Sequence, residues 1–110
     1  MSWTSLRLKK GVSIRGIKPE MVLGIQVVVG FFEKNNIKDV WITSCVDGRH
    51  GKNSLHYVGY AIDVRIWDII SDRRNWFTSE LNKEMGSEFD CVLEKDHIHI
   101  EFQPKEKLNG

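Results

Sequence analysis

The spacing of apolar residues switches between a helical and a strand-like period along the chain. Residues 19–36, PEMVLGIQVVVGFFEKNN, carry apolar side chains on nearly every face of a helix. Pro19 suits the first helical turn, because a backbone N–H has no partner there. We therefore predict a central, buried helix that ends at Asn35 and Asn36.

Strands are predicted where β-branched and aromatic residues gather or alternate with polar ones. Four segments meet this description: DVWITS (39–44), GYAIDVRIW (59–67), FDCVL (89–93) and HIHIEF (97–102). Residues 45–53, CVDGRHGKN, are polar and contain glycine, so they predict a loop.

A second helix is predicted from about residue 71 to Met85. Ser71 or Asp72 can cap its start and Gly86 can stop it. Its apolar residues recur at every fourth position: Phe77, Leu81 and Met85.

The last strand separates apolar from polar side chains. A period of two sends Ile98, Ile100 and Phe102 to one face and His97, His99 and Glu101 to the other. Because the apolar face belongs in the core, the histidines face away from it.

Length and composition restrict the class of protein. With 110 residues, 41% hydrophobic and 28% charged, the chain fits one small domain over residues 1–110. A formal net charge of +1 offers no general attraction for nucleic acid. The basic residues near the start favour a solvated arm over contact with an anionic wall polymer: Arg7, Lys9, Lys10, Arg15 and Lys18.

The sequence shows no clear pattern for membrane insertion, for a signal peptide or for a cysteine motif. The apolar run 21–32 is shorter than the about 20 residues that cross a bilayer, so no membrane insertion is expected. No charged-then-apolar signal peptide precedes it, so we expect synthesis in the cytoplasm. Cys45 and Cys91 form no CxxC motif and are expected to be buried thiols, with their pairing left open.

Histidine and carboxylate side chains cluster near the predicted strands. His56, His97 and His99 lie on strands or strand ends, and a neighbouring strand can present His56 and Asp63 opposite the other two histidines. Each histidine alone fits a structural role better, but imidazole and carboxylate together are zinc ligands, and an open fourth position makes a site catalytic.

A catalytic zinc site also needs a base for the attacking water. Glu94 precedes His97 by three residues and Asp96 precedes His99 by three. Spacing alone does not separate these two candidates. Without the histidines, the same turn would be an ordinary solvated one.

Two motifs resemble one enzyme family. SLHYVGYAID (54–63) fits SxHxxGxAxD, and DHIH (96–99) fits DxxH. In this order and spacing they resemble the zinc D-alanyl-D-alanine carboxypeptidases and L-alanyl-D-glutamate endopeptidases of bacteria and phages, in particular the short phage or prophage type.

The resemblance implies an α+β fold of the hedgehog/DD-peptidase type, with a small, mainly antiparallel sheet and helices packed on one face. It implies Zn²⁺ as cofactor, the peptidoglycan stem peptide as substrate, and action on the cell wall, for example after phage-type release. The residues that it assigns are His56, Asp63 and His99 as zinc ligands, Asp96 as general base, His97 as oxyanion donor and Ser54 as support.

One departure from the family concerns substrate recognition. Many members carry an arginine before the first ligand, and this chain has none at the matching place. Arg49, His50 or Lys52 can substitute from the loop, although solvated loop charges explain them equally well, and Arg65 follows the second ligand.

Two alternatives to an enzyme stay open. One is a zinc-binding module of the same fold without activity; Asp96 argues against it, because such a module needs no base. The other is a wall-binding or phage structural domain without metal. The tryptophans do not decide between them, because they fit core or rim positions better than a sugar-stacking platform: Trp41, Trp67 and Trp76.

Overall fold

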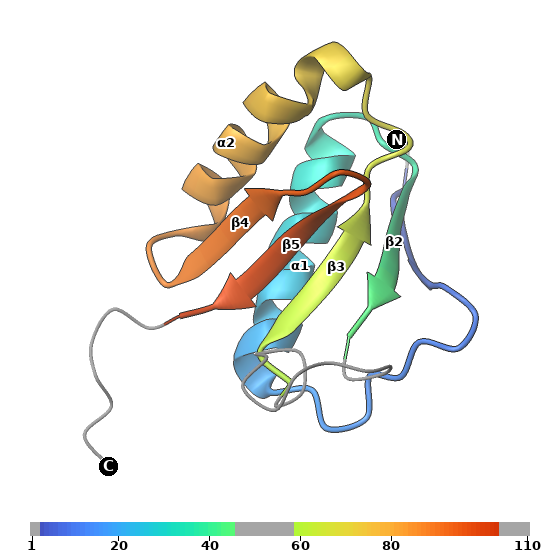
Figure 1. Ribbon diagram of the computed structural model, residues 1–110, viewed down its shortest axis with the longest axis vertical. Helices are drawn as coiled ribbons and strands as arrows, with labels where there is room; N and C mark the ends of the chain where they lie inside the picture. Colours follow the sequence, from blue (N-terminus) through green and yellow to red (C-terminus); the bar gives the residue numbers. More distant parts are fainter. Residues whose placement is uncertain (1–2, 46–58, 104–110) are drawn as a thin grey trace.

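The computed structural model describes residues 3–45 and 59–103. Two helices and five strands follow one another along this part of the chain (Figure 1). Their order is β1 (Ser5–Leu8), α1 (Pro19–Lys34), β2 (Asp39–Ser44), β3 (Ala61–Arg65), α2 (Arg74–Met85), β4 (Phe89–Leu93) and β5 (His97–Phe102).

The strands form one mixed sheet in the order β1-β2-β3-β5-β4. Only β1 and β2 run parallel, and the other neighbours are antiparallel. The predicted α+β class with a mainly antiparallel sheet is confirmed. β2, β4 and β5 have the predicted bounds, whereas β3 is shorter than the predicted segment 59–67.

Both helices cover the same face of the sheet (Figure 1). Alternate residues of the central strands point into the core beneath them: Val40, Ile42, Ile62, Val64, Ile98 and Ile100. Phe77 of α2 packs edge-on against Phe31 and Phe32 of α1, with ring centroids 4.9 and 5.1 Å apart. The opposite face of the sheet therefore carries the polar half of each strand.

Helix α1 is amphipathic in its packing although its sequence is apolar on nearly every face. Met21, Val28 and Phe32 are almost fully buried, whereas Leu23 is 62% exposed. Within residues 3–45 and 59–103, the predicted burial of α1 is therefore confirmed for the face that packs on the sheet and wrong for the face that carries Leu23.

The start of the second helix also differs from the prediction. A 3₁₀ turn, Ser71–Arg73, precedes α2, and no side chain caps either element. The predicted capping by Ser71 or Asp72 is therefore wrong. The buried positions Phe77, Leu81 and Met85 and the end at Gly86 are confirmed.

Strand β1 was not predicted. Its four residues are exposed and lie at the edge of the sheet beside β2. Arg7 of this strand pairs with Asp39 of β2, with Nε 2.8 Å from Oδ1. The basic segment is therefore solvated, as expected, but part of it is ordered as a strand.

Gly59 positions the entry into β3. It is buried at a φ of +84°, and a Cβ atom there would lie 2.5 Å from the carbonyl oxygen of Gly16. The backbone N–H of Lys18 donates a hydrogen bond to the carbonyl of Gly59. The backbone therefore passes close to another segment here, which is the loop before α1.

The two cysteines are buried, as expected, and do not pair with each other. Burial, with a smaller effect of Asp90, raises the pKa of the Cys91 thiol to about 12. Within residues 3–45 and 59–103, no helix is long and apolar enough to cross a membrane.

Candidate active site

The polar face of β3 and β5 brings two predicted zinc ligands together. Asp63 and His99 are direct partners in the antiparallel ladder, as are Arg65 and His97. Side chains of directly opposed residues lie about 4.5–5.5 Å apart at Cβ, so these four side chains share one small area of the sheet.

His99 lies between two carboxylates. Its Nδ1 atom is 3.0 Å from Oδ1 of Asp63, and its Nε2 atom is 2.8 Å from Oε1 of Glu101. The hydrogen bond with Asp63 is the main reason that the pKa of His99 is raised above its usual value; burial opposes the shift, and Glu101 adds to it.

Two carboxylates flank the ring of His99, and this arrangement favours positive charge there. A neutral imidazole that donates from Nε2 to Glu101 directs its Nδ1 lone pair at a carboxylate oxygen, which is repulsive. Either a proton on Nδ1 or a metal cation removes this repulsion. Histidine ligands in metal sites commonly have this arrangement, with one ring nitrogen on the metal and the other donating to a carboxylate.

His97 and Asp96 form a second pair beside the first. Nδ1 of His97 is 2.7 Å from Oδ1 of Asp96, and its Nε2 is 3.5 Å from Oδ1 of Asp63. The hydrogen bond with His97 holds the pKa of the exposed Asp96 carboxyl below its usual range. Asp96 is therefore ionised at neutral pH and can accept a proton.

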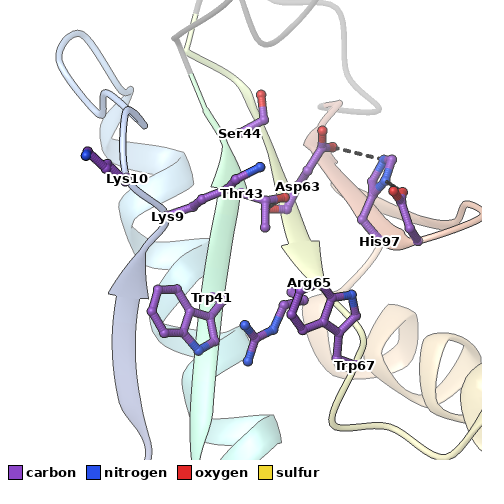
Figure 2. A pocket seen from close by; sticks show the side chains of 10 residues that line it. Lys9, Lys10, Trp41, Thr43, Ser44, Asp63, Arg65, Trp67 and His97 are labelled. Carbon is purple, nitrogen blue, oxygen red and sulfur yellow. Dashed lines mark hydrogen bonds and ion pairs between the residues drawn. The ribbon is translucent and has the colours of Figure 1, made fainter.

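A cavity of about 440 Å³ opens over these residues. Asp63 and His97 line it (Figure 2), as does Asp96, whose Oδ1 lies 2.7 Å from Nδ1 of His97. Thr43 and Ser44 line it as well, together with a basic and aromatic group of residues that forms the basic side of the cavity: Lys9, Lys10, Trp41, Arg65 and Trp67. Glu94, the competing candidate for the base, does not line this cavity.

The remaining predicted site residues lie outside the described part of the chain. They are His56, the third predicted zinc ligand, with Ser54, Arg49 and His50. Among residues 3–45 and 59–103, no group of three or more His, Cys, Asp or Glu side chains is arranged to hold a metal ion. Asp63 and His99 therefore supply two donors, and a zinc site on this face also needs His56.

One residue of this face was missed from the sequence. Glu101 was assigned only to the polar face of β5, although its contact with His99 is as short as a strong hydrogen bond. Its i, i+2 spacing from His99 was the available signal. Trp67 is 71% exposed at the cavity and Trp41 is half-buried in its wall, in agreement with the expected core or rim positions.

No protein-family model, curated protein or solved structure matches this chain.

Proposed function

We propose that the protein is a zinc-dependent peptidase that cleaves a peptide bond in the stem peptide of peptidoglycan. The observation that carries the proposal is the pairing of Asp63 with His99 directly beside the Asp96 and His97 pair. Two motifs of the sequence converge there, because Asp63 closes the first and residues 96–99 form the second. The proposed fold is correspondingly of the hedgehog/DD-peptidase type.

The donor chemistry suits zinc. His56, Asp63 and His99 would hold the ion, with Glu101 orienting the His99 ring through Nε2. A bound zinc ion would polarise the scissile carbonyl and lower the pKa of the attacking water.

Asp96 and His97 would handle the protons of the reaction. Asp96, a carboxylate at neutral pH that lines the cavity, would take a proton from water as the water oxygen bonds to the carbonyl carbon. It then returns that proton to the leaving amine as the C–N bond breaks. His97, whose Nδ1 lies 2.7 Å from Oδ1 of Asp96, would offer its other ring nitrogen, Nε2, to the oxyanion.

The activity is tested with the full chain, isolated peptidoglycan and a synthetic stem pentapeptide, with the products identified by mass spectrometry. We expect the protein to release new amino groups from these substrates. The release should stop when a chelator removes the zinc and resume when zinc is added back. Asp96→Ala should lower the rate about 100-fold or more while keeping the metal. Glu94→Ala is the matched control, since Glu94 lies outside the cavity, and should remain active.

Two outcomes would contradict this account. Cleavage by Asp96→Ala at the wild-type rate would remove Asp96 as the base. A wild-type protein that binds zinc and releases nothing from any wall type would be the non-catalytic zinc-binding module. The basic and aromatic side of the cavity suits such a binding module as well as it suits an enzyme.

A further inference from the structure

Arg65 occupies the centre of the basic side of the cavity. Its guanidinium carbon lies 4.9 Å from the ring centroid of Trp41 and 4.5 Å from that of Trp67. The guanidinium group therefore lies between two indole rings (Figure 2). Cation–π contacts of this kind hold an arginine in place and replace part of its hydration.

The guanidinium group retains donors for a ligand. Arginine has five N–H donors in one plane, and aromatic stacking occupies only its faces. Its Nη2 atom lies 3.5 Å from Oδ2 of the half-exposed Asp68, at the outer limit for a hydrogen bond. Its Nε atom is buried and has no hydrogen-bond partner among the described residues. A planar anion is the ligand that such a group binds best.

Arg65 is close to the proposed reaction centre. It follows Asp63 by two residues on the same face of β3 and is paired with His97 of β5. Two strand residues span about 7 Å. A group bound by Arg65 therefore lies within one or two peptide units of a bond held at Asp63 and His97.

The cavity wall carries charges of both signs. Lys9, Lys10 and Arg65 line it together with the carboxylates Asp63 and Asp96. An anionic group entering the cavity is thus attracted to the three cations and repelled by the two carboxylates.

We propose that Arg65, held between Trp41 and Trp67, binds a carboxylate of the substrate. This inference rests on the proposed function and defines its substrate class as peptides with a free carboxylate on the residue after the cleaved bond. A terminal D-alanyl-D-alanine has one, and so does L-alanyl-γ-D-glutamate, in which the chain continues through the γ-carboxyl and leaves the α-carboxylate free. The two cleavage types then share one anchoring group.

The test compares matched peptides in which this carboxylate is either free or converted to an amide. One pair ends in D-alanyl-D-alanine, and the other contains L-alanyl-γ-D-glutamate. Both KM and kcat are measured with the zinc-loaded full chain, and Kd is measured from tryptophan fluorescence. We expect the wild type to prefer the acid by about 10- to 100-fold within at least one pair, mainly in KM and Kd.

Two variants locate this preference. Arg65→Gln should remove it by weakening binding of the acid and not of the amide, and Arg65→Lys should reduce it because lysine lacks the planar fork. Arg73→Gln is the control, because Arg73 also stacks on a tryptophan, 4.5 Å from the ring centroid of Trp76, but does not line this cavity. It should keep the full preference.

The inference is overturned if the wild type binds acid and amide equally in both pairs, or if Arg65→Gln keeps the preference. If Arg65→Gln does not fold, an unreduced preference in Arg65→Lys overturns it as well. Arg65-dependent binding of the acid without cleavage supports the inference and refutes the peptidase. Cleavage without any preference refutes the inference and leaves the peptidase.

Discussion

At the scale of single residues, His99 shows how much of the site depends on its neighbours. The sequence predicts that His97 and His99 face away from the core, and the structure places both on the polar face of the sheet. It does not predict which carboxylates they meet. That depends on the register of β5 against β3, which follows from packing across the whole sheet.

The raised pKa of His99 predicts a pH-dependent stability of the metal-free protein. A pKa raised by Asp63 and Glu101 means that the folded state binds the proton more tightly than the unfolded state. The stabilisation is full below the ordinary histidine pKa of about 6.5 and is lost as the pH rises through the folded pKa. In urea unfolding of chelated protein, His99→Gln should therefore destabilise more at about pH 5.5 than at about pH 9.

An equal loss of stability at the two pH values would show that His99 contributes no proton-linked stabilisation. The interpretation of its contacts with Asp63 and Glu101 as charge-assisted would then be wrong.

At the scale of elements, the bounds of helices and strands are predicted best where the local sequence pattern agrees with the packing. β5 alternates strictly and has its predicted bounds, and α1 begins at its proline. β1 was missed because it is four residues long, exposed, and paired with a strand over thirty residues later. The basic side of the cavity was missed for the same reason, since it joins β1, β2 and β3 through pairings that no local pattern encodes.

The junction between the loop before α1 and the start of β3 gives a prediction about stability. Gly59→Ala should lower the free energy of unfolding by about 1–3 kcal/mol, through strain at φ +84° and through the clash with the Gly16 carbonyl. Gly11→Ala is the matched control, because Gly11 has a φ of +89° and open space around its Cα. Urea unfolding of both variants measures the difference.

We expect Gly59→Ala to be clearly the more destabilising of the two. Equal effects would mean that the backbone contact at Gly16 relaxes without cost, and that it does not hold β3 against the loop.

At the scale of the whole molecule, the two faces of the sheet have different roles: one stabilises the fold and the other carries the candidate active site. One face packs on α1 and α2 and contains the hydrophobic core (Figure 1). The other face carries Asp63, His97 and His99 and the cavity, whose lining is shown in Figure 2. Substitutions on the polar face should therefore alter metal or ligand binding with less effect on folding than substitutions in the core.

We propose that Asp63 and His99 hold a zinc ion together with His56. The zinc content is measured on protein purified without chelator and dialysed against zinc-free buffer. We expect about one zinc per chain in the wild type and in Asp96→Ala, and little in Asp63→Asn or His99→Gln. No zinc in the folded wild type, or as much in Asp63→Asn as in the wild type, would rule out this zinc site.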